Sequence, residues 1–274
     1  MKIALGFNIH EPCERKRVAI DSWLAMHDKY NVNLFDVRFV DDRTSHHDKI
    51  NTLNCLNRDS SHVTKSTKRL PFVNDVLAQL CALNYDYFIF CNDDIIINEN
   101  LIKHVVTNRP QCLACSRLDI STLNSYDQVI DRKVNPVRYE IAGFDLFVFK
   151  TTWYKQNQML FNDYLVGEPC WDQVYATIMR IYGCGHAFGN KFPPFCFHQL
   201  HAPTWQNRDS VEKQFNMKQS QKPVDRLFLK IFDTYLKRHL IKRQPWGGFM
   251  NLLNDETSIE SNYFNQVTCP ITSA

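Results

Sequence analysis

The chain has 274 residues, of which 44% are hydrophobic and 22% are charged. These values are typical of one soluble globular domain, or of one domain with an appended segment, and a 13% aromatic fraction excludes a disordered chain. No run approaches the ~20 apolar residues of a membrane-spanning helix, which excludes an integral membrane protein. A formal net charge of +3 is too small to indicate a nucleic-acid partner by itself.

The N-terminus and the ten cysteines favour a cytoplasmic location. The apolar stretch after Met1 runs directly into charge and lacks the length and cleavage site of a signal peptide. Cysteines inside apolar runs, such as Cys91 and Cys196, are expected to be buried reduced thiols. The CxxC pair Cys112 and Cys115 has no second pair at zinc-site spacing, so core thiols on a strand are favoured over a metal or redox site.

The predicted elements alternate between strand and helix through about the first 118 residues. In chain order they are a strand at 2–9, a helix at 12–29, a strand at 32–40, a loop at 43–69, a helix at 71–84, a strand at 87–91, a helix at 99–106 and a strand at 112–116. In the first helix, Arg15, Lys16 and Arg17 are expected on the solvated side. This alternation predicts an α/β sheet with helices on both faces.

The pattern changes after residue 118. Strand material at 139–150 is interrupted by Gly143, which predicts a bulge or a close backbone approach. A helix at 171–182, a short strand at 195–200 and an amphipathic basic helix at about 224–243 complete the predicted elements.

Three polar residues follow the most apolar predicted strand. Asn92, Asp93 and Asp94 come directly after the YFIFC run, and ligands bind at the carboxyl ends of strands in open α/β sheets. Adjacent carboxylates beside apolar sequence require a cation or hydrogen-bond donors, and oxygen ligands suit Mg²⁺ or Mn²⁺. A plain turn is the alternative, because Asn and Asp are common turn formers.

The segment YDYFIFCNDDI, between one helix and the polar start of another, resembles the Asp-x-Asp region of GT-A-fold glycosyltransferases. The resemblance covers the strand order of about residues 1–200. It implies a GT-A-like, Rossmann-like α/β fold, with a mostly parallel sheet flanked by helices and a helical C-terminal segment. It also implies a nucleotide-sugar donor, a UDP- or GDP-sugar, whose diphosphate is held by Mn²⁺ or Mg²⁺.

The same resemblance assigns roles to the polar residues of this half. Asp94, helped by Asp93, is the expected metal ligand, and Asp93 with Asn92 would contact the donor. Asn92 departs from the family pattern, which usually has an Asp there, and brings no charge. Asp41 or Asp42, at the end of the second strand, would face the base or ribose.

His198 and His201 in CFHQLHAPTW are the candidates for a further metal ligand, which the resemblance places late in the domain. Two imidazoles suit a transition ion such as Mn²⁺. The alternative is one core histidine and one surface histidine, because residues three apart on an extended segment do not share a face.

Carboxylates in the second half are the candidate catalytic and sugar-binding groups. Glu168 and Asp172 in GEPCWDQ lie near a helix start, where the dipole alone would favour negative charge. The resemblance implies that one of them, Asp172 before Glu168, takes the proton of the acceptor hydroxyl. Asp145, after the glycine of the interrupted strand, is expected to bond sugar hydroxyls, or else to lie at the surface of a plain bulge.

The basic helix at 224–243 has two interpretations. It carries an apolar stripe surrounded by Lys and Arg, which suits peripheral contact with an anionic membrane. Packing on the domain with a solvated basic face is favoured.

The sequence therefore predicts a metal-dependent glycosyltransferase that moves a sugar from a nucleotide-sugar to a hydroxyl of a glycan or lipid-linked acceptor, with retention or inversion unassigned. Residues 1–206 would form the catalytic domain, with a nucleotide-binding half at 1–118 and an acceptor half at 119–206, and 207–274 a helical extension packed on it. The alternatives are a nucleotidyltransferase acting on sugar phosphates, which would carry a glycine-rich loop after the first strand, and a non-catalytic carbohydrate-binding protein.

Overall fold

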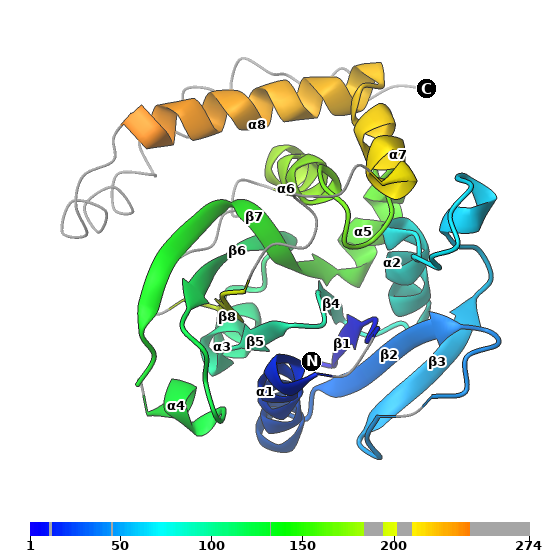
Figure 1. Ribbon diagram of the computed structural model, residues 1–274. Helices are drawn as coiled ribbons and strands as arrows, with labels where there is room; N and C mark the ends of the chain where they lie inside the picture. The colour runs from blue at the N-terminus through cyan, green and yellow to red at the C-terminus, as the bar shows by residue number, and fades with distance from the viewer. Residues whose placement is uncertain (11–12, 45, 132, 184–193, 202–209, 242–274) are drawn as a thin grey trace.

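The structure is a computed structural model that describes residues 1–10, 13–44, 46–131, 133–183, 194–201 and 210–241. Within these residues, the strands form one sheet with the order β3-β2-β1-β4-β7-β6-β8-β5 (Figure 1). The strands are β1 (Ile3–Phe7), β2 (Asn33–Phe39), β3 (Ile50–Leu56), β4 (Tyr87–Cys91), β5 (Ile95–Ile97), β6 (Cys112–Ile120), β7 (Pro136–Lys150) and β8 (Cys196–Gln199). The α/β fold class predicted from the sequence is confirmed.

The sheet has a parallel half and a mixed half. β3, β2, β1 and β4 are parallel, so their carboxyl ends meet at one edge. β7 is antiparallel to both β4 and β6, while β8 is parallel to β6 and antiparallel to β5. β4 therefore lies in the middle of the sheet, where its YFIFC sequence is buried throughout.

Helices cover both faces of the sheet (Figure 1). One core lies under α1 and α3, and the other under α2, α5, α6 and α8. The helices are α1 (Glu14–Tyr30), α2 (Val73–Ala82), α3 (Glu99–Asn108), α4 (Asp127–Ile130), α5 (Thr151–Asn157), α6 (Trp171–Tyr182), α7 (Val211–Ser220) and α8 (Pro223–Ile241). Trp23 of α1 shows why the first helix forms here: its ring is fully buried, stacks on Phe7 and donates to the carbonyl of Ile95 at 2.9 Å.

The predicted loop at 43–69 is wrong in part. The strand β3 lies inside it, parallel to β2, and a 3₁₀ turn (Ser60–His62) follows. β3 is an edge strand whose asparagines bond to the neighbouring backbone: Asn51 donates to the carbonyl of Leu34 and Asn54 to that of Phe39. Such a strand is polar because one edge and part of both faces are solvated. It therefore lacks the apolar pattern by which a strand is predicted from sequence.

The irregularity predicted at Gly143 is present. In the β6–β7 ladder, Ser116 pairs with Phe144 and the next residue, Arg117, pairs with Glu140. Residues 141–143 of β7 therefore have no partner on β6, which bends β7 at the edge of the candidate site.

The C-terminal helices α7 and α8 pack against α6, and α8 spans the top of the molecule (Figure 1). Phe228 and Phe232 of α8 are buried, and Phe232 packs edge-on against Phe144. Two other members of the predicted apolar stripe, Val224 and Leu227, are more than half exposed. The side chains of 235–241 and all of 242–274 lie outside the described residues.

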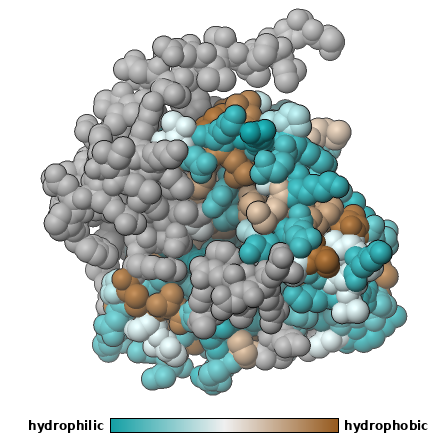
Figure 2. Space-filling model, turned by 45° about the horizontal axis from the view of Figure 1, so that its top comes forward, coloured by the Kyte–Doolittle hydropathy of each residue, from teal (hydrophilic) through white to brown (hydrophobic). Residues whose placement is uncertain are grey.

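None of the described helices combines the length and hydropathy needed to cross a membrane. Figure 2 shows a face on which hydrophilic side chains predominate among the described residues and apolar ones gather only in small groups.

Replacing Phe232 by alanine is expected to lower the free energy of unfolding by about 3–5 kcal/mol, because it empties a fully buried ring site between α8 and β7. Leu227→Ala, on the same helix but 56% exposed, is the matched control and should change stability by much less. Urea denaturation measures the free energy of unfolding of both variants.

Deletion of the chain from residue 223 onward should give insoluble protein. A soluble, folded deletion variant that had lost only its binding to anionic vesicles would instead support the membrane interpretation.

Candidate active site

Three side chains whose atoms could hold a metal ion lie together where β4 ends. Asp94 follows β4 and directly precedes β5, and His198 lies on β8, whose residue 198 pairs with Ile95. His201 follows β8. The ligand atoms of Asp94, His198 and His201 all lie within 4.8 Å of one another, so the structure brings together three of the four metal ligands expected from the sequence.

The two histidines stabilise the ionised form of Asp94. The Nε2 atoms of His198 and His201 both lie 3.5 Å from Oδ2 of Asp94 and 3.2 Å from each other. Burial opposes ionisation of Asp94, but the two histidines outweigh it and hold the pKa of that carboxyl well below its usual range. Burial likewise disfavours a charged His198, but bonds with Asp119 and Asp94 raise the pKa of its ring to about 9.

The fourth expected ligand, Asp93, faces a different partner. Its Oδ2 lies 2.6 Å from Nζ of Lys16 and accepts the backbone N–H of His10 at 3.1 Å. Lys16 is 7% exposed, and Nε of Arg15 lies 3.7 Å from Oδ2 of Asp94. The expectation that Arg15 and Lys16 lie on a solvated side of the first helix is therefore wrong.

The physical reason is the direction of α1. The helix follows β1, so its first turn lies at the carboxyl edge of the sheet, beside the acidic residues. Cations in the first turn oppose the helix dipole and need a compensating partner. The run Arg15-Lys16-Arg17 at a helix start was thus a usable indication of nearby carboxylates.

Asn92 and Asp145 form a second polar group beside the first. Nδ2 of Asn92 donates to Oδ1 of Asp145 at 2.6 Å, while Oδ1 of Asn92 is buried without a hydrogen-bond partner. The other oxygen of Asp145 pairs with Arg117. Asp145 is buried and lies among polar groups of the site, so the alternative of a surface residue on a plain bulge is wrong.

The two candidate catalytic carboxylates, Asp172 and Glu168, differ in position and surroundings. Asp172 opens the first turn of α6, is partly buried, and accepts the backbone N–H of Phe144 at 3.2 Å. Burial, reinforced by the charge of Asp145, raises the pKa of Asp172 to about 7. Glu168 lies in the turn before the helix, so it does not share a helical face with Asp172, and burial raises the pKa of its carboxyl.

The two aspartates after β2 are engaged with arginines. Asp41 is exposed and accepts two bonds from Arg69, at 2.8 and 3.0 Å. Asp42 pairs with Arg38 and accepts a hydrogen bond from the backbone N–H of Thr44. The guanidinium of Arg69, the last residue of the predicted loop, is therefore engaged by carboxylates.

Residues that the sequence interpretation missed complete the site. Arg117 and Asp119 lie two apart on β6, and buried Asp36 and Arg38 form an ion pair on β2. Their sequence spacing could have indicated these pairs, because charged residues inside apolar strands are buried only when they have partners.

The side chains of Trp171, Cys112 and Cys115 lie in the core. Trp171 is a core residue packed against Phe90 and Phe147, whereas Trp205 and Trp246 lie outside the described residues. Cys112 and Cys115 are fully buried, and no disulfide joins cysteines in the described part of the chain.

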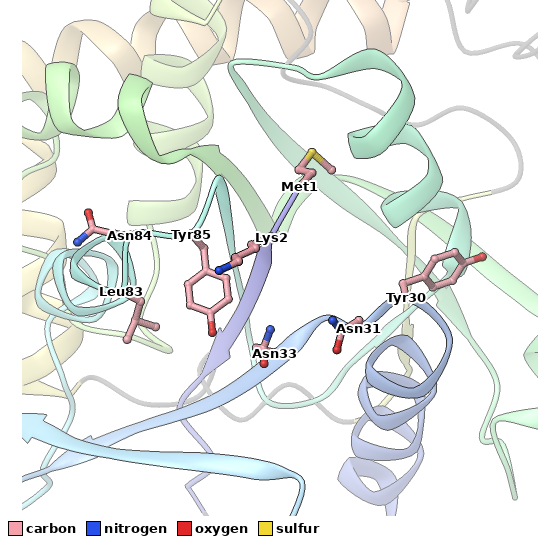
Figure 3. Close-up of a pocket in the computed structure, with 8 residues that line it drawn as sticks. All are labelled: Met1, Lys2, Tyr30, Asn31, Asn33, Leu83, Asn84 and Tyr85. Carbon is pink, nitrogen blue, oxygen red and sulfur yellow. The ribbon is translucent and has the colours of Figure 1, made fainter.

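A cavity of about 460 Å³ lies at the opposite edge of the sheet, away from this site (Figure 3). Its lining comes from the amino ends of β1, β2 and β4 and from the ends of α1 and α2, with Lys2, Asn33 and Tyr85 among the residues drawn. None of the site residues described above lines it.

No protein-family model and no curated protein matches the sequence. Solved structures with a similar arrangement include residues 1–349 of S. aureus TarS in complex with UDP-GlcNAc, with 13% identity, 87% of this chain and 72% of that chain covered, and a TM-score of 0.49. A putative nucleotide-diphospho-sugar transferase from Desulfovibrio desulfuricans G20 has 12% identity, 87% and 98% coverage and a TM-score of 0.40. The galactosyltransferase LgtC has 12% identity, 85% and 96% coverage and a TM-score of 0.34.

One of these structures holds UDP-GlcNAc, and the other two are described as a putative nucleotide-diphospho-sugar transferase and a galactosyltransferase. Identities of 12–13% with TM-scores below 0.5 transfer no function, so the function of this chain has to be argued from its own residues.

Proposed function

We propose that the chain is a metal-dependent glycosyltransferase that moves a sugar from a nucleotide-sugar to the hydroxyl of a glycan or lipid-linked acceptor. The observation that carries the proposal is the Asp94, His198 and His201 group at the carboxyl end of β4. A carboxyl of pKa about 7, Asp172, lies within reach of the charges of Asp145 and Arg117. Ligand sites of open α/β sheets lie at this edge, and perturbed carboxyls are typical of catalytic sites.

The donor atoms fit a divalent transition ion. One carboxylate oxygen and two imidazole nitrogens suit Mn²⁺ better than Mg²⁺, which prefers oxygen ligands. The unpaired Oδ1 of Asn92 is a neutral oxygen close to the same strand end. When bound, the ion would supply positive charge against the diphosphate of the donor.

The chain's own residues supply the other requirements. Arg15 and Lys16, at the start of α1, place two positive charges and a helix N-terminus beside the acidic group, which is an arrangement that binds phosphates. Nε of Arg15 is buried without a hydrogen-bond partner, so it has a donor to offer. Asp93 would keep Lys16 in place, and Asp41 or Asp42 would face the nucleoside.

On the acceptor side, we assign Asp172 as the base. A carboxyl with a pKa near 7 binds a proton far better than an ordinary carboxylate, and this suits it to remove a proton from a hydroxyl at neutral pH. Asp145, fixed between Asn92 and Arg117, would bond sugar hydroxyls. The catalytic domain would span residues 1–206, and residues 207–274 would form a helical extension packed on it, with peripheral membrane contact through 224–243 as the alternative role of the basic helix.

Thermal stabilisation by nucleotides tests the proposal. UDP, GDP or CMP together with Mn²⁺ should raise the melting temperature more than either component alone. At about 100 times the dissociation constant the gain is about 2.7 kcal/mol, or roughly 5–10 °C for a chain of this size. Stabilisation by nucleoside triphosphates and sugar phosphates instead would favour the nucleotidyltransferase, and stabilisation by oligosaccharides alone would favour the carbohydrate-binding protein.

A further inference from the structure

Asp119 lies directly behind the proposed metal ligand His198. Its Oδ1 lies 3.0 Å from Nδ1 of His198, while Nε2 on the far side of the same ring faces Asp94 and His201. Asp119 is 0% exposed. The imidazole therefore separates this carboxylate from the metal-binding group.

The backbone fixes this arrangement. Asp119 on β6 and His198 on β8 are direct partners in a parallel ladder, so their side chains project from the same face of the sheet. On its other side, β8 pairs residue 198 with Ile95, which follows Asp94. Three adjacent strand segments thus set the order Asp119, His198, Asp94 across the sheet.

A neutral imidazole binds a metal through its unprotonated nitrogen. The hydrogen bond made by the other nitrogen decides which of the two carries the proton. An acceptor at Nδ1 keeps the proton there and leaves the lone pair of Nε2 toward Asp94 and His201. We propose that Asp119 is a positioning residue that holds His198 in the metal-binding tautomer and orientation. This inference rests on the proposed metal site and deepens it.

Arg117 holds Asp119 in turn. Its Nε donates to the same Oδ1 of Asp119 at 3.0 Å, and its other end pairs with Asp145. Burial disfavours the guanidinium charge, but Asp145 and Asp119 outweigh it and raise the pKa of Arg117. Arg117 Nε and His198 Nδ1 thus contact the same oxygen of Asp119, and this contact fixes the orientation of the buried carboxylate behind His198.

The affinity for Mn²⁺ alone, measured by calorimetry or from the electron paramagnetic resonance signal of the free ion, tests the inference without any turnover. Loss of a group that orients a metal-binding histidine typically weakens the metal affinity 10–100-fold. Asp119→Asn keeps a neutral acceptor at the same place, so we expect a smaller loss than in Asp119→Ala. Asp225→Asn is the matched control, because Asp225 is also 0% exposed and accepts bonds from Tyr164 and Asn162 in α8 packing.

Two outcomes separate failure of the inference from failure of the proposed function. If Asp94→Ala loses Mn²⁺ binding while both Asp119 variants bind as the unaltered protein does, the positioning role of Asp119 is refuted and the metal site stands. If Asp94→Ala binds Mn²⁺ normally, the metal site itself is refuted, and the role of Asp119 with it. A loss in the Asp119 variants that Asp225→Asn reproduces at an equal drop in melting temperature would also overturn the inference, because general destabilisation would then explain it.

Discussion

Replacing Asp94 by alanine is expected to abolish the binding of Mn²⁺ and the Mn²⁺-dependent stabilisation by nucleoside diphosphates. The carboxylate is the anionic member of the Asp94, His198 and His201 group, and two imidazoles alone bring no negative charge to hold the cation. The fold should persist, because the side chain is partly exposed and the strands around it are held by their own ladders. Calorimetry with Mn²⁺ and melting curves with UDP or GDP measure the two effects.

The control for this variant is Asp28→Ala, which removes an exposed aspartate of α1 that pairs with Lys49, and it should leave both measurements unchanged. Unchanged nucleotide affinity in Asp94→Ala would refute the assignment of Asp94. His198→Ala and His201→Ala, measured in the same way, would then show whether the histidines bind Mn²⁺ without it.

Replacing Asp172 by asparagine is expected to reduce sugar transfer by at least ~10², the typical cost of losing a general base. Asparagine keeps the shape and accepts the N–H of Phe144, but it cannot take up the acceptor proton. Donor binding should stay near normal because Asp172 is not a member of the Asp94, His198 and His201 group that is proposed to hold the metal and the donor diphosphate. Transfer assays and nucleotide-binding curves measure these effects, and Glu168→Gln is the matched comparison.

Transfer at close to the normal rate in Asp172→Asn would reduce this residue to a helix-start aspartate and make Glu168 the next candidate. The opposite result, loss in Asp172→Asn with little change in Glu168→Gln, is the expected one.

Comparing the pH dependence of the unaltered protein with that of Asp172→Asn measures the pKa of the Asp172 carboxyl independently. Its pKa is about 7 in the folded chain and 3.8 as the reference value, so the folded state binds the proton more tightly between these values. The free energy of unfolding should therefore fall as the pH rises from about 4 to 7, by up to about 4 kcal/mol, and then level off. In Asp172→Asn this loss should be absent, while in the unaltered protein transfer should rise through pH 7 as the carboxyl becomes a base. A stability difference between the two proteins that does not change with pH would contradict this assignment.

The sequence by itself predicted most of the buried elements and indicated where polar residues gather. The buried strands β1 and β4, the helix α6 and the polar triplet after YFIFC follow from local periodicity and composition, which depend on neighbours along the chain. It also placed Asp94, His198 and His201 in one expected metal site, through a resemblance over a dozen residues. The edge strand β3 and the short strand β5 were missed, because one is polar and the other is three residues long.

Only the tertiary structure decided which charges meet. The sequence predicted that Arg15 and Lys16 lie on a solvated side of the helix. Because α1 follows β1 at the carboxyl edge of the sheet, they instead pair with Asp94 and Asp93. Asp119 is buried behind His198 because β6 and β8, nearly eighty residues apart, are neighbours in register. Electrostatic interactions depend on distance and burial rather than on sequence separation, so the pKa of Asp172 and the support of His198 exist only once the sheet has formed.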